Sequence, residues 1–134
     1  MKLTQEKIDE LIDNDRIIYC FDIDNTIREF INPEKFEPIS RMINIINNRY
    51  DRGHYIHLYT ANNDKKGVEK WLKEYGVKYH EITYNKPVAH IYIDDASVNA
   101  YDFMKYPGHW DNLYKNCGNR INYIMRSFYN KKDD

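Results

Sequence analysis

Hydrophobic positions along this 134-residue chain follow two periods, which predict alternating strands and helices. Short apolar runs, typical of strands buried on both faces of a parallel sheet, occupy residues 17–21, 55–59, 79–82 and 91–93. Two helical faces fall between these runs: Ile39, Met42, Ile43 and Ile46, then Val68, Trp71, Leu72 and Tyr75. The alternation predicts an α/β fold of three layers, Rossmann-like, with a mainly parallel sheet covered by helices.

The two ends of the chain carry further helical patterns. Thr4 is placed to cap a short helix within an extension over residues 1–15. Near the other end, two apolar faces precede a polar tail at residues 130–134: Trp110, Leu113, Tyr114 and Cys117, then Ile121, Ile124, Met125 and Phe128. The length predicts a single domain over residues 1–134.

Composition narrows the class of protein. The formal net charge is -1, so no global basic field indicates a nucleic-acid partner, although a local basic groove stays open. The two cysteines form neither a CxxC pair nor a cluster with histidine, which argues against a zinc site. No apolar run approaches the ~20 residues that span a bilayer, and the charged start does not resemble a signal peptide. We expect a cytoplasmic protein without a membrane partner.

Polar residues follow three of the predicted strands. Asp22 and Asp24 come after the first, Thr60 after the second, and Asp94 and Asp95 after the fourth. The carboxyl ends of parallel strands meet at one edge of a sheet, where ligands bind. Close carboxylates repel one another unless a proton or a cation lies between them, and their oxygens suit Mg²⁺. The sequence therefore predicts a magnesium site at this edge.

Lys86 precedes the fourth strand and adds a cation to the same set. A carboxylate nucleophile, a hydroxyl, a lysine and a bound metal are the groups that phosphoryl transfer uses.

Four segments, in order, resemble the motifs of the haloacid dehalogenase superfamily. Residues 21–27 (FDIDNTI) resemble its first motif, DxDxT, and residues 55–60 (YIHLYT) its second. Lys86-Pro87 resembles the third motif, and residues 91–95 (IYIDD) the fourth. The resemblance covers residues 17–100. The stretch 85–95 is also similar to small phosphatases associated with capsule or surface-sugar biosynthesis.

The resemblance implies a role for each acidic residue. Asp22 would attack phosphorus and become an aspartyl phosphate. Asp24 would protonate the leaving group and then activate water. Mg²⁺ would bind the Asp22 carboxylate, the main-chain carbonyl of Asp24 and Asp94, with Asp95 contributing through water.

The resemblance also implies how the phosphoryl group is held. Thr60, Ala61 and Lys86 would bind its oxygens, and Thr26 would brace the nucleophile loop. Asn25 stands where glycine is common, and asparagine tolerates the left-handed backbone that a tight turn needs.

Two further departures concern the substrate, and the histidines show no pattern. Asn62 stands where the narrower relatives often have arginine, so their substrate contact is in doubt here. Arg28 is either a substrate contact or a surface residue. The five histidines are scattered and are expected to pack or to lie on the surface: His54, His57, His80, His90 and His109.

The family often inserts a cap domain over the site, but the gaps at 27–38 and 60–86 hold no more than a flap or one βα unit. The resemblance thus implies a capless phosphatase, open to an extended substrate or closed by a neighbouring chain in a homo-oligomer. The expected activity is Mg²⁺-dependent hydrolysis of a phosphomonoester, and a sugar phosphate is the favoured substrate. A nucleic-acid end or a phosphoprotein is the alternative substrate.

Two non-enzymatic classes share parts of the pattern. A receiver domain also uses an acidic pair, a threonine and a Lys-Pro, but there the acidic pair comes early, whereas here Asp94 and Asp95 follow Lys86. The second non-enzymatic class is a catalytically silent module that only binds phosphate. The presence of every core catalytic residue disfavours it.

Overall fold

A computed structural model describes residues 2–87, 89–94 and 99–109 of the chain. The chain divides into two units, residues 1–95 and residues 96–134. The described part of the second unit contains helix α4 (Ala100–Lys105), which begins where the Asn99 side chain accepts a hydrogen bond from the Tyr101 amide at 2.9 Å. The helical faces predicted between residues 110 and 128, the tail and Asp95 lie outside the described residues. The single domain stays a prediction.

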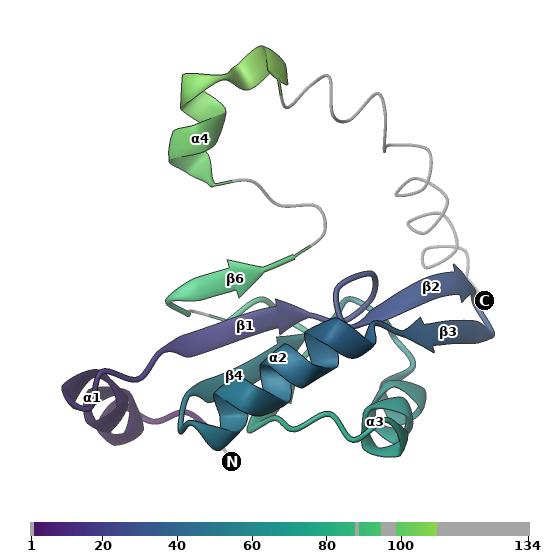
Figure 1. The fold of residues 1–134 in the computed structure, drawn as a ribbon, viewed down its shortest axis with the longest axis horizontal. Helices are drawn as coiled ribbons and strands as arrows, with labels where there is room; N and C mark the ends of the chain where they lie inside the picture. The colour runs from purple at the N-terminus through teal and green to yellow at the C-terminus, as the bar shows by residue number, and fades with distance from the viewer. Residues whose placement is uncertain (1, 88, 95–98, 110–134) are drawn as a thin grey trace. The chain divides into compact units, whose positions relative to one another are not determined.

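A parallel sheet forms the centre of the first unit (Figure 1). Its order is β5 (Glu81–Thr83), β4 (Tyr55–Tyr59), β1 (Ile18–Asp22) and β6 (Ile91–Ile93), and every neighbouring pair is parallel. The four predicted strands are confirmed, with ends displaced by at most two residues. β1 lies between β4 and β6, as expected for a strand whose apolar run is buried on both faces.

Helices α2 (Ser40–Asp51) and α3 (Lys65–Glu74) cover one face of this sheet. The apolar faces predicted for them are the faces that become buried, except that Tyr75, which follows the last residue of α3, is 42% exposed. They pack on alternate strand residues in one cluster, whose buried members include Phe21, Ile43, Ile46, Ile56, Leu58, Val68, Trp71 and Leu72. α3 begins where the Asp64 side chain accepts a hydrogen bond from the Gly67 amide at 3.1 Å.

Helix α1 (Gln5–Asp13) covers the opposite face through Leu11, which packs with Ile18 and Tyr55. Its first turn is capped by Thr4, whose hydroxyl accepts a hydrogen bond from the Lys7 amide at 3.1 Å. The sheet therefore has helices on both faces, and the predicted three-layer α/β class is confirmed. Among the described helices, none combines the length and the apolar character needed to cross a bilayer.

An antiparallel hairpin, β2 (Arg28–Asn32) and β3 (Lys35–Pro38), occupies the gap between β1 and α2. The rings of Phe30 and Phe36 meet edge to face across it, with centroids 5.5 Å apart. The gap between β4 and β5 holds α3. In the part of the chain that the structure describes, neither gap holds a cap domain, as predicted.

Candidate functional site

Two carboxylates end neighbouring strands at one edge of the sheet. Asp22 is the last residue of β1 and pairs with Tyr59 at the end of β4. On the other side of β1, Phe21 pairs with Ile93, the last residue of β6. Asp94 follows Ile93 directly, so the chain delivers Asp94 beside Asp22. The sequence prediction that these two acidic residues converge is therefore confirmed at the level of the backbone.

The charges of these carboxylates change the pKa values of nearby side chains on β1 and β4. Burial raises the pKa of Tyr59, and the charges of Asp22 and Asp94 raise it further. Burial also raises the pKa of Cys20 to about 11, with Lys86 acting in the opposite direction and the same two carboxylates adding to the increase. Two carboxylates and one ammonium group thus act on one small region at the strand ends.

The loop that follows β1 is a tight turn. The Ile23 carbonyl accepts hydrogen bonds from the amides of Ile27 at 2.8 Å and Arg28 at 3.2 Å. Asn25 has φ 65°, and its side chain accepts a hydrogen bond from the Phe30 amide at 3.0 Å. The left-handed backbone expected at Asn25 is therefore confirmed, and its side chain fastens the turn to β2.

The Asp24 carboxylate is buried and both of its oxygens accept hydrogen bonds. Arg28 donates to Oδ1 through Nε at 2.8 Å, and the Thr60 hydroxyl donates to Oδ2 at 3.2 Å. The Thr60 oxygen in turn accepts a hydrogen bond from the Asn62 amide at 3.0 Å. Thr60 and Asp24, predicted from different strand ends, are brought into direct contact.

Arg28 is buried, so the surface role is wrong, and the substrate contact stays a prediction. It is 2% exposed, and its guanidinium carbon lies 3.6 Å from the centroid of the Phe36 ring and 5.2 Å from that of Trp71. Aromatic faces and a carboxylate stabilise a cation that would otherwise be costly to bury. Residues 24–28 form a turn, so the spacing of four residues that signals an ion pair on a helix does not apply here.

The remaining predicted residues are less closely gathered. Lys86 is exposed, and its Nζ lies 4.5 Å from the centroid of the Tyr92 ring in β6. Ala61 is exposed directly after Thr60. The hydroxyl of Thr26 is buried and has no hydrogen-bond partner among the described residues, whereas its main-chain amide donates to the Ile23 carbonyl at 3.2 Å.

The fit to Mg²⁺ depends on oxygen donors. Within residues 2–87, 89–94 and 99–109, no three histidine, cysteine, aspartate or glutamate residues gather as a metal site. Asp22 and Asp94 supply two carboxylates, and the side chain of Asp24 is engaged by Arg28 and Thr60. The main-chain carbonyl of Asp24 is the third donor that the family resemblance implies. An all-oxygen set of this kind suits Mg²⁺.

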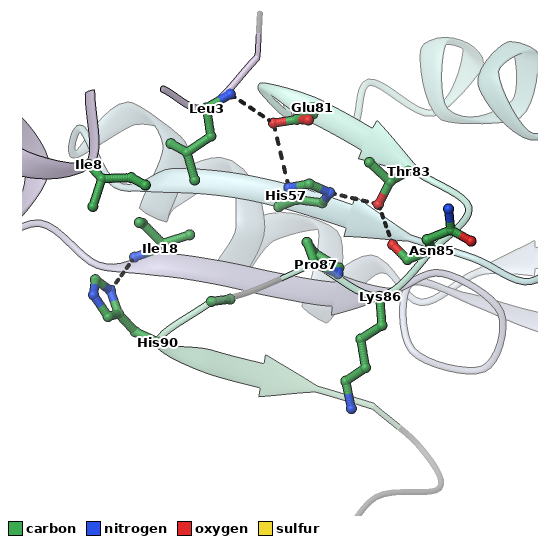
Figure 2. A pocket seen from close by; sticks show the side chains of 11 residues that line it. Leu3, Ile8, Ile18, His57, Glu81, Thr83, Asn85, Lys86, Pro87 and His90 are labelled. Atoms are coloured by element: carbon green, nitrogen blue, oxygen red, sulfur yellow. Dashed lines mark hydrogen bonds and ion pairs between the residues drawn. The ribbon is translucent and has the colours of Figure 1, made fainter. Parts of the chain in front are cut away.

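A cavity of about 440 Å³ lies elsewhere, on the sheet face that α1 covers (Figure 2). Figure 2 shows Glu81, His57 and Thr83 in a row along it, with His57 Nδ1 3.6 Å from Glu81 Oε1 and His57 Nε2 2.8 Å from the Thr83 hydroxyl. Lys86 borders the cavity, and its side chain extends toward β6. None of the strand-end carboxylates lines it, so this cavity is not the predicted phosphoryl site.

Comparison with known proteins supports the fold and goes no further. No protein-family model matches the chain, and no protein with a curated description matches it. A solved structure of a conserved protein from Bacteroides thetaiotaomicron is similar to it, with a TM-score of 0.51 and 15% sequence identity. The alignment covers 68% of this chain and 88% of that protein. At this identity the likeness concerns the α/β fold alone.

Proposed function

We propose that this protein is a Mg²⁺-dependent phosphomonoester hydrolase in which Asp22 is the nucleophile. The observation that carries the proposal is the delivery of Asp22 and Asp94 to adjacent strand ends, with Lys86 acting on the same region. Two neighbouring carboxylates repel one another, and a divalent cation removes that repulsion. The order of the four motifs along the chain supports the same assignment.

The residues divide the reaction into two steps. An Asp22 oxygen bonds to phosphorus as the bond to the ester oxygen breaks, and the departing alkoxide takes its proton from Asp24. Asp24 then accepts a proton from water, whose oxygen bonds to phosphorus as the Asp22–phosphorus bond breaks. The products are an alcohol and inorganic phosphate, and both carboxyl groups return to their initial states. Lys86 offsets the charge of the phosphoryl oxygens.

Asp22 and Asp94, with the Asp24 main-chain carbonyl, would hold Mg²⁺. When bound, the ion supplies charge that stabilises the phosphoryl oxygens.

The substrate class is proposed as a sugar phosphate, on the likeness of residues 85–95 to surface-sugar phosphatases. Neither described gap holds a cap, which suits an extended ester as well. A nucleic-acid end phosphate and a phosphoprotein therefore belong in the same substrate panel.

A second candidate is a phosphate-binding module that does not turn over. One observation favours it: Arg28 and Thr60 already donate hydrogen bonds to the two oxygens of Asp24, so this carboxylate has a structural role without turnover. Such a module would bind phosphate or retain a phosphoryl group on Asp22 without releasing it.

The test measures hydrolysis of an aryl phosphate with Mg²⁺ and with EDTA, in the wild type and in Asp22→Asn. Asp13→Asn, an exposed change in α1, is the matched control. Activity that needs both Mg²⁺ and Asp22, and that survives in Asp13→Asn, supports the enzyme. Full activity in Asp22→Asn would exclude Asp22 as the nucleophile. If neither the aryl ester nor the panel of sugar phosphates, phosphorylated oligonucleotides and phosphopeptides is hydrolysed, the silent module replaces the enzyme.

A further inference from the structure

The Arg28 side chain is enclosed on three sides. Its Nε donates to Asp24 Oδ1 at 2.8 Å, and the two side chains are 3% and 7% exposed. Phe36, from the hairpin, and Trp71, from α3, lie against the guanidinium at 3.6 and 5.2 Å from their ring centroids. The guanidinium is planar and presents fixed donors at its edge, so rings on its faces direct that edge toward the carboxylate.

Local structure alone does not explain a buried cation here. The turn is already closed by hydrogen bonds from the amides of Ile27 and Arg28 to the Ile23 carbonyl. An apolar side chain would fill the space between Phe36 and Trp71 without the cost of burying a charge. The feature that requires a cation with a directed N–H is the Asp24 carboxylate.

We infer that Arg28 is a positioning residue for Asp24, an inference that rests on the function proposed above. Arg28 and Thr60 hold the two carboxylate oxygens from different elements, which fixes the direction in which Asp24 faces the strand ends. Arg28 itself is 2% exposed and its Nε is engaged by Asp24, so its effect on catalysis would be exerted through that carboxylate. Through Phe36 and Trp71, the same side chain ties the hairpin and α3 to the carboxylate.

The kinetic test compares two substrates that differ in how much they need a proton donor. An aryl phosphate has a good leaving group, whereas an alkyl phosphate needs protonation as the ester bond breaks. In Arg28→Met we expect kcat for the alkyl ester to fall about a hundredfold, the lower range of general acid–base contributions, and that for the aryl ester to fall much less. KM should change little for either ester. Arg28→Lys, which retains a cation, should recover part of the loss.

Arg41→Met is the matched control, because Arg41 is exposed on α2. Its kcat should equal that of the wild type for both esters. A merely structural loss in Arg28→Met would lower the concentration of folded enzyme and slow both esters by one factor, and that result would overturn the positioning role. Equal wild-type rates in Arg28→Met would overturn it as well. If Arg28→Met does not fold, kcat for the alkyl and aryl esters is compared in Arg28→Lys instead.

A structural readout separates this inference from the proposed function. If the wild type hydrolyses no phosphomonoester, the proposed function fails, and crystal structures of the wild type and Arg28→Met then decide the role of Arg28. An Asp24 carboxylate that turns away from the Thr60 hydroxyl in the variant supports positioning. A carboxylate that keeps the wild-type orientation in the variant overturns it.

Discussion

The Ile56 amide donates a hydrogen bond to Nδ1 of His80 at 3.0 Å, where β4 begins. Two more histidines do the same at the start of β1: His54 Nδ1 accepts from the Ile17 amide and His90 Nδ1 from the Ile18 amide, each at 3.0 Å. An imidazole accepts at Nδ1 only while that nitrogen carries no proton. Unprotonated Nδ1 atoms of these histidines therefore satisfy main-chain amides at the starts of β1 and β4.

Stability should fall in mild acid for this reason. Burial lowers the pKa of His80 and of His54, with Lys7 contributing at His80 and Arg16 foremost among nearby arginines at His54. The unfolded chain then binds more protons than the folded one, so the free energy of unfolding decreases as pH drops below about 6.5, the ordinary histidine pKa, toward the lowered folded values.

Urea unfolding at about pH 8 and about pH 5.5, either side of that ordinary pKa, measures the effect. His54→Asn is the informative variant, since an asparagine oxygen can accept from the Ile17 amide and does not titrate. It should show a smaller loss of stability between the two pH values than the wild type. An equal loss in both proteins would exclude His54 as a contributor.

Asn25 should tolerate glycine better than alanine. Its φ of 65° costs an alanine about 1–2 kcal/mol and a glycine almost nothing. Both changes remove the side-chain acceptor of the Phe30 amide, worth about 1 kcal/mol. We therefore expect Asn25→Ala to be destabilised by about 2–3 kcal/mol and Asn25→Gly by about 1 kcal/mol, from urea midpoints.

Asn44→Ala, on the exposed side of α2, is the control for loss of an asparagine and should change the midpoint little. Equal destabilisation by glycine and alanine at position 25 would show that the backbone conformation contributes nothing.

Cys20 should resist alkylation in the folded protein. It is 2% exposed, and burial raises its pKa from 9.0 to about 11, which lowers the thiolate fraction near pH 8 about a hundredfold before access is considered. We expect iodoacetamide to leave Cys20 unmodified under native conditions and to modify it in urea, as followed by peptide mapping. Rapid labelling of Cys20 without denaturant would contradict the buried placement.

The strands and the strand-end carboxylates could be predicted from the sequence because they depend on local pattern. A continuous apolar run identifies β1, and the edge at which Asp22 and Asp94 meet follows from parallel pairing alone. The assignments of function to these residues depend on the family resemblance and stay predictions.

The environment of Arg28 could not be predicted, because its partners come from three separate elements. A charged residue is normally exposed, and only the meeting of Phe36, Trp71 and Asp24 around it makes burial tolerable. β5 was predicted two residues early for a related reason: Tyr79 and His80 are apolar enough to read as strand, yet the His80 ring stacks between Tyr50 and Tyr55 before the strand begins.

The position of β1 within the sheet also determines the order of assembly during synthesis. Tyr19 pairs with Ile56 on one side and with Ile91 on the other, so β1 is synthesised before both of its neighbouring strands. Its apolar run has no partner strand during that interval, and both pairings require closure of a long loop. The nucleophile predicted at Asp22 is therefore synthesised early but reaches its neighbour Asp94 only once β6 has docked.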